Sequence, residues 1–312
     1  MALFFRKLFS RRDKCFYICV MTGDVQTYRV ADFCFEVEGM PFEPANLLPF
    51  KTEPNDAEKI FHLKVVSELP ETDSTLLYRT PEDPRFHVIT LYTQNNGYLV
   101  EFQSLPSNPV SGRMLVDASF RQAQIELSSH EKVFALDNAM KLLYTFSSAH
   151  LGALQIHSSV VIQDGKGYLF LGKSGTGKST HSQLWLKHIP GTELLNDDFP
   201  VLRLLPDKSI RIYGSPWSGK TPCYKSQDAP VGAIVHLSQA PYNKIERVSV
   251  IRAYGSLLES CAAFRPLKSF ADGWHRTMEG VCTTTPYYRL ECLPNEEAAL
   301  LCYQTVTNNS QI

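Results

Sequence analysis

The sequence lacks the features that mark membrane proteins and nucleic-acid-binding proteins. No stretch approaches the roughly 20 consecutive apolar residues of a membrane-spanning helix, and the apolar run from Cys15 to Met21 ends at Thr22, Gly23 and Asp24. A net charge of -1 gives no global field toward nucleic acid or acidic lipid. No signal-peptide core is recognisable, so we expect a cytoplasmic protein with neither a membrane nor a nucleic acid as its partner.

Cysteine pairs with the spacing of zinc or redox sites are also missing. None of the eight cysteines forms a C-x-x-C pair. We therefore expect reduced, buried thiols. One basic cluster lies near the start, at Arg6, Lys7, Arg11, Arg12 and Lys14. A membrane or nucleic-acid role for this cluster is one reading, and a solvated terminus is the simpler one.

Residues 1–130 form a strand-rich region of unknown role. Phe33–Glu38 alternates apolar and polar residues, as a half-buried strand does. The apolar segments 87–92 and 98–102 flank a hairpin turn at residues 93–97. Many prolines favour short strands over long helices here. No catalytic motif is present in this region.

Residues 131–312 are expected to form a second domain. Apolar residues at helical spacing predict a helix over 133–146 that stops near Gly152. Strands 155–162 and 167–171 form a hairpin around Asp164-Gly165, and a helix follows over 178–188. Further strands are expected at 192–195, 201–205, 209–213, 233–237, 246–250 and 287–292, and Asn295 caps a last helix. The fold class is therefore α/β, with a mixed sheet around one phosphate-loop helix.

The strongest motif is a phosphate-binding loop. Its residues are Gly172, Lys173, Ser174, Gly175, Thr176, Gly177, Lys178 and Ser179, with Thr180 next on the helix. Glycines allow backbone N–H groups to surround an anion, and the helix start adds positive potential. Lys178 is expected at the β- and γ-phosphates, and Ser179 on Mg²⁺. The motif predicts binding of ATP, or alternatively GTP, with Mg²⁺.

Two aspartates and one histidine complete the expected site. Asp197 and Asp198 end the strand after the loop helix, and adjacent strand residues point to opposite faces. One carboxylate can hold the metal while the other accepts a proton from the attacking hydroxyl, although a plain Asn-Asp-Asp turn fits the same residues. The hairpin register places His157 opposite Gly172. In the loop 214–221, Trp217 and Lys220 are weaker candidates that an ordinary turn explains equally well.

Together, His157-Ser-Ser-Val-Val, the loop 172–179 and Asn196-Asp-Asp198 resemble the kinase domain of HPr kinase/phosphorylase, over residues 150–307. That family shares its fold with phosphoenolpyruvate carboxykinase. The resemblance implies that His157 assists transfer, Asp198 is the general base and Mg²⁺ lies at Ser179, so Asp197 is the expected second metal ligand. Thr180 stands where the family's kinases have an acidic residue, as in the carboxykinases. The substrate segment of that family and its amino-terminal domain have no clear counterpart here.

The expected function is a Mg-ATP-dependent kinase acting on a hydroxyl, with Ser or Thr of a protein or peptide as the leading acceptor. A kinase for a small hydroxylated metabolite is the alternative enzyme. A nucleotide-binding regulator without transfer activity is the alternative from another class. A homo-oligomer is compatible with the sequence.

Overall fold

The computed structural model describes residues 24–308, apart from residues 55, 82, 85, 220 and 262–266. Several residues named above are not among those described. They are the basic cluster between Arg6 and Lys14, the cysteines Cys15 and Cys19, and Lys220. The chain divides into two compact units, the first ending at Ser148 and the second beginning at Ala149. Within the described ranges, no helix is both long and apolar enough to cross a membrane.

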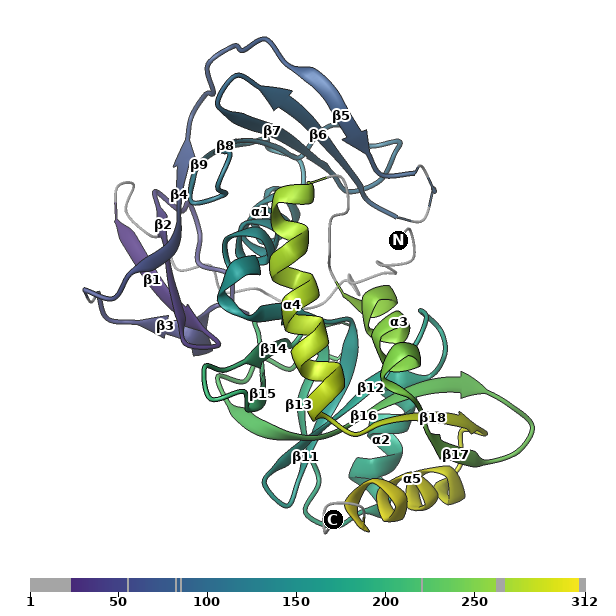
Figure 1. The fold of residues 1–312 in the computed structure, drawn as a ribbon. Helices are drawn as coiled ribbons and strands as arrows, with labels where there is room; N and C mark the ends of the chain where they lie inside the picture. The colour runs from purple at the N-terminus through teal and green to yellow at the C-terminus, as the bar shows by residue number, and fades with distance from the viewer. Residues whose placement is uncertain are drawn as a thin grey trace. The chain divides into compact units, whose positions relative to one another are not determined.

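The first unit contains a nine-stranded sheet with one helix against it (Figure 1). Its strands are β1 (Val25–Val30), β2 (Phe33–Glu38), β3 (Lys51–Thr52), β4 (Lys59–Val66), β5 (Thr75–Arg79), β6 (Val88–Gln94), β7 (Gly97–Gln103), β8 (Gly112–Asp117) and β9 (Gln122–Leu127). They lie in the order β3-β1-β2-β4-β9-β8-β7-β6-β5. The β2–β4 and β4–β9 pairs are parallel and the other pairs are antiparallel, so the sheet is mixed.

Local sequence explains much of this sheet. The alternating segment Phe33–Glu38 is β2, and its residues Phe35 and Val37 are fully buried. The expected hairpin is β6–β7, in which Gln94 pairs with Gly97 across the turn. Both predictions are confirmed.

The first helix belongs to the first unit. Helix α1 (Lys132–Ser147) packs on β4, β7, β8 and β9, and its buried residues include Leu136, Met140 and Leu143. The units therefore divide after Ser148 and not near residue 130, because the apolar stripe of α1 is buried against the first sheet. The helix ends before Gly152, which has a φ of +77° and follows a short 3₁₀ turn at Ala149–Leu151.

The second unit is also a mixed sheet with helices (Figure 1). Its strands are β10 (Ala153–Gln155), β11 (Ser158–Gln163), β12 (Lys166–Leu171), β13 (Glu193–Asp198), β14 (Val201–Leu204), β15 (Ile210–Tyr213), β16 (Asp228–Gln239), β17 (Lys244–Arg247) and β18 (Tyr287–Cys292). Its helices are α2 (Lys178–His188), α3 (Val250–Ser260), α4 (Lys268–Thr284) and α5 (Glu296–Asn308). The main path is β10-β14-β15-β16-β12-β11-β13, and β18 pairs with β16 and β17.

A buried core lies between this sheet and the helices α2 and α5. Trp185 on α2 is fully buried and contacts Phe170 of β12, Tyr168 of β12 and Tyr303 of α5. Figure 1 shows α2 and α5 side by side, and the two helices are in contact. Helix α3 lies against the opposite face of strands β16 and β18. Its residue Ser256 forms hydrogen bonds with side chains of both strands. The catalytic candidates are therefore held on a rigid, well-packed sheet.

Several predicted elements differ from the structure. The expected strand over 155–162 is two strands, β10 and β11, because β10 pairs with β14 while β11 pairs with β12 and β13. The expected strand over 246–250 ends earlier, since α3 begins at Val250. Helices α3 and α4 had no counterpart in the sequence prediction. The cap of the last helix is confirmed, because the side chain of Asn295 accepts the Ala298 N–H at 3.0 Å.

Candidate active site

The loop Gly172–Ser179 joins the end of β12 to the start of α2. Gly172 has a φ of +147° and Gly177, at the helix N-cap, has a φ of +105°, which are backbone conformations that side chains disfavour. A Cβ at Gly172 would lie only 3.0 Å from Thr176 Oγ1 and 3.1 Å from the Leu237 carbonyl oxygen. The loop can therefore fold closely over the strand end only with glycine at these positions.

Lys178 lies beneath this loop. Its side chain donates a hydrogen bond to the Gly172 carbonyl at 3.0 Å, and the residue is only 8% exposed. Burial lowers the pKa of the ammonium to about 8, while the carboxylates of Asp198 and Asp197 act in the opposite direction. The site thus holds a desolvated cation next to two carboxylates.

The two aspartates lie on opposite faces of the sheet. Asp197 pairs with Ser159 of β11 and Asp198 pairs with Ser158, so the two side chains alternate across the strand. Asp197 lies on the α2 face, where Ser179 Oγ donates to its Oδ1 at 2.9 Å. Asp198 lies on the other face. The sequence prediction that the two carboxylates serve different tasks is compatible with this division.

Ser179 and Asp197 have the spacing of two magnesium ligands. Mg²⁺ binds oxygen at about 2.0–2.1 Å in an octahedron, so two adjacent ligand oxygens lie about 2.9 Å apart. The oxygens of Ser179 and Asp197 are 2.9 Å apart. Among the described residues, no cluster of three or more His, Cys, Asp or Glu side chains could hold a metal alone. A metal here would take its other ligands from phosphates and water.

His157 is next to the second aspartate. Its Nε2 lies 3.4 Å from Asp198 Oδ1, and the histidine is 7% exposed. The backbone fixes this position, because the His157 N–H donates to the Ser260 carbonyl at 2.8 Å, at the end of α3. The neighbouring pair Ser158 with Leu171 has the register that a turn at Asp164-Gly165 predicts. The predicted register of the hairpin is therefore confirmed, while His157 itself precedes β11 and is held by Ser260.

The strand that carries the aspartates does not lie directly beside the loop strand. Strand β11 lies between β12 and β13. Strands β12 and β13 remain parallel to one another, because each is antiparallel to β11. Their carboxyl ends still meet at one edge of the sheet. His157 directly precedes β11, at the end of that strand where Ser158 pairs with Asp198.

Asn196 has a positioning role that the sequence analysis did not assign. Its buried amide donates to the carbonyls of Ser215 at 3.2 Å and Trp217 at 3.4 Å. The Gly219 N–H in turn donates to the Asp197 carbonyl at 2.6 Å. Trp217 is 3% exposed, so its ring packs in the interior rather than lining an open pocket. Asparagine is rare in strands, so Asn196 in the strand that carries the aspartates was a sequence signal for such a role.

A cleft of about 810 Å³ opens beside the first half of the loop. It is lined by Lys173, Ser174, Gly175 and Thr176 of the loop, by residues at the ends of β16 and β18, and by Arg252, Gly255, Ser256 and Glu259 of α3. Gln239 of β16 supports the loop, donating to the Gly175 carbonyl at 3.2 Å. His236 bonds to Ser256, which also accepts the Tyr287 hydroxyl at 2.6 Å. None of these cleft residues outside the loop was identified from the sequence.

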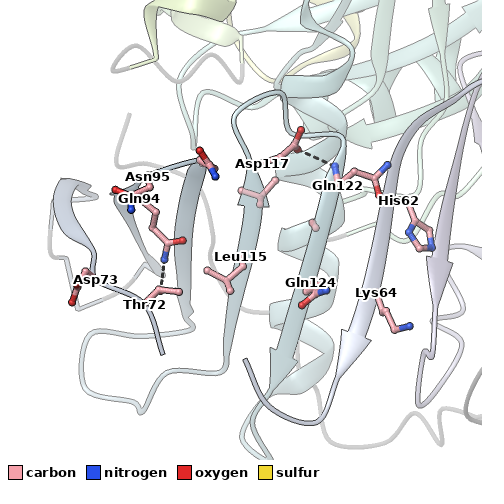
Figure 2. A pocket seen from close by; sticks show the side chains of 14 residues that line it. His62, Lys64, Thr72, Asp73, Gln94, Asn95, Leu115, Asp117, Gln122 and Gln124 are labelled. Atoms are coloured by element: carbon pink, nitrogen blue, oxygen red, sulfur yellow. Dashed lines mark hydrogen bonds between the residues drawn. The ribbon is translucent and has the colours of Figure 1, made fainter. Parts of the chain in front are cut away.

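The first unit has a hollow of its own, of about 530 Å³ (Figure 2). Amide side chains line much of it, among them Gln122 and Gln124 of β9. Its two basic side chains are already paired, because His62 lies 3.4 Å and Lys64 lies 2.6 Å from the carboxylate of Glu38. The hollow contains none of the loop, histidine or aspartate residues described above.

Comparisons with known proteins show distant similarity to solved structures only. No protein-family model matches the chain. No curated protein matches it either. Among solved structures, the HPr(Ser) kinase/phosphatase from Coxiella burnetii aligns with a TM-score of 0.31 and 14% sequence identity, over 50% of this chain and 89% of that chain. The identity and the TM-score mark this similarity as distant.

Proposed function

We propose that this protein is a kinase that transfers the γ-phosphate of Mg-ATP to a hydroxyl group of a protein or peptide. The observation that carries the proposal is the meeting of three groups at one sheet edge. These are the buried Lys178 under the glycine loop, the Ser179–Asp197 oxygen pair and the His157–Asp198 pair. Each group suits a different part of phosphoryl transfer.

The loop and Lys178 suit the phosphates. The backbone of Gly172–Ser179 wraps the start of α2, where N–H groups and the helix dipole favour an anion. The Lys178 ammonium balances the charge of the β- and γ-phosphates, and exchanges its bond to the Gly172 carbonyl for them. Binding of ATP thereby relieves the cost of burying a lysine.

Ser179 and Asp197 suit a bound Mg²⁺, which would neutralise charge on the phosphate oxygens. Their oxygens need little rearrangement for this task, because they already have the spacing of adjacent octahedral ligands.

Asp198 suits the role of general base. The acceptor hydroxyl oxygen forms a bond to the γ-phosphorus, while the bond from that phosphorus to the bridging oxygen breaks and ADP leaves. The hydroxyl proton passes to the Asp198 carboxylate, which His157 orients through its contact at 3.4 Å. General-base catalysis of this kind typically contributes about 10²–10⁴-fold in rate.

A labelled transfer assay tests the proposal. The protein is incubated with a cell lysate, Mg²⁺ and ATP labelled at either the γ- or the α-phosphate, with labelled GTP in parallel. Stable label in an acid-resistant product is expected from the γ-phosphate alone. The same assay with Lys178→Ala serves as the control. Label from both positions, or equal labelling by the variant, contradicts the proposal.

A further inference from the structure

A row of paired residues links the catalytic aspartate to the cleft. Across the sheet, Asp198 pairs with Ser158, Ser158 with Leu171, Leu171 with His236, and His236 with Arg289. Laterally paired residues point to the same face of a sheet. Asp198, His236 and Arg289 therefore share the face that α3 meets, whereas the metal candidate Asp197 lies on the α2 face.

The length of this row sets a scale for a ligand. Neighbouring strands are about 4.8 Å apart, so His236 lies roughly 14 Å and Arg289 roughly 19 Å from Asp198. An extended polypeptide advances about 3.3 Å per residue. A bound polypeptide whose Ser or Thr hydroxyl lies at Asp198 would therefore reach His236 in the cleft about four residues from that Ser or Thr.

Helix α3 forms the opposite wall and runs toward the same centre. Arg252, Ser256 and Glu259 line the cleft from successive turns of α3. The last residue of the helix, Ser260, accepts the backbone N–H of His157. The wall of the cleft thus leads from Arg252 to the His157–Asp198 pair.

The cleft borders the first half of the phosphate loop. Lys173–Thr176 line it, whereas Lys178, Ser179 and Thr180 do not. Lys178 and Ser179 are the residues that suit the phosphates and the metal, at the start of α2. The cleft therefore borders the loop on the side away from the helix start.

The charge of the cleft favours an acidic ligand. Among the residues that the structure describes, the side chains of Lys173 and Arg252 form no salt bridge, and Arg289 is paired with Glu291 at 2.7 Å. Glu259 is the only carboxylate among the described lining residues. It lies at the end of α3 that adjoins His157, and Arg252 lies toward the other end. The cation excess is therefore greatest at the part of the cleft farthest from the catalytic pair.

We infer that this cleft binds the acceptor polypeptide and selects an acidic residue about three to five positions from the phosphorylated Ser or Thr. Arg252, with Lys173 and Arg289 nearby, is the specificity determinant. This inference rests on the kinase activity proposed above and names the class of its substrate.

The test uses the full chain and synthetic peptides. Each peptide carries one Ser in an Ala-Gly background, with Glu or Lys placed at one position within about six residues on either side. We expect the highest kcat/KM for Glu at about three to five positions on one side. Arg252→Glu should lower this value about five- to tenfold and raise that of the matching Lys peptide. Arg276→Glu, on an exposed helical arginine outside the cleft, should leave both unchanged.

Two readouts separate the possible failures. The KM for ATP should be the same in the wild type, Arg252→Glu and the milder Arg252→Gln. A rise in the KM for ATP, with unchanged peptide selection, would assign the cleft to the nucleotide and overturn the inference. Peptide phosphorylation without preference for Glu would overturn it as well. Transfer to small hydroxylated compounds but to no peptide would overturn it and leave kinase activity intact, whereas absence of any transfer would remove the proposed function itself.

Discussion

The pKa of Lys178 predicts a specific pH dependence of nucleotide binding. Burial lowers the pKa of this ammonium to about 8 without ligand. Phosphates beside it favour the charged form and raise the pKa. The bound state therefore carries more protons than the free state above pH 8, so binding takes up a proton and weakens as the pH rises.

The magnitude follows from the pKa of Lys178. With a pKa of about 8, roughly 90% of the lysine is charged at pH 7 and roughly 10% at pH 9. The Kd for Mg-ATP should therefore rise about tenfold between these pH values, if the pKa of Lys178 in the bound state is about 10 or higher. With such a bound pKa, calorimetry in two buffers of different ionisation enthalpy should show an uptake of about 0.8–0.9 proton at pH 9.

Lys178→Arg provides the control, because arginine stays charged throughout this range. The variant should bind with a flatter pH profile, and Lys178→Ala should not bind measurably. The reasoning is refuted if wild-type affinity is constant from pH 7 to 9, or if the arginine variant loses affinity to the same extent.

Three further predictions concern the framework of the site. Gly172→Ala should weaken ATP binding in calorimetry at least tenfold, because the new Cβ would lie 3.0–3.1 Å from Thr176 and Leu237, and unchanged affinity would contradict this. Trp185→Ala should lower the free energy of unfolding in urea by about 3–5 kcal/mol, since the ring is fully buried, whereas a loss under 1 kcal/mol would contradict this. A fragment Ala149–Ile312 should bind ATP as the full chain does, and a folded fragment without binding would show that the first unit contributes to the site.

Local chemistry explains which parts of the fold the sequence predicts. The Asp164-Gly165 turn adopts positive φ at both residues, of 50° and 71°, which fixes the hairpin register. Helix α2 begins after a glycine loop, and α5 begins after the Asn295 cap. These signals lie within a few residues of the turn and the helices that they determine, so the sequence predicts those elements.

Long-range pairing explains what the sequence did not predict. The position of β11 between β12 and β13 depends on strand partners distant in the chain. Helix α4 contains Gly273 and Gly280, which weaken a helical prediction but allow close contact with Ala149 and Leu204 in the fold. The cleft residues Arg252 and Arg289 come from separate elements, so no local spacing brings them together.

The division of roles between the two aspartates is the most direct test of the central claim. Calorimetry with and without Mg²⁺, together with γ-phosphate transfer to an acceptor found in the labelling assay, is measured for Asp197→Asn and Asp198→Asn. Asp198→Asn should keep Mg-ATP affinity within about threefold and lose about 10²–10⁴-fold in transfer rate, because an amide cannot accept the proton. Asp197→Asn should lose the dependence of binding on Mg²⁺. Normal transfer by both variants would contradict the proposed kinase mechanism, and the opposite pattern would reverse the two roles.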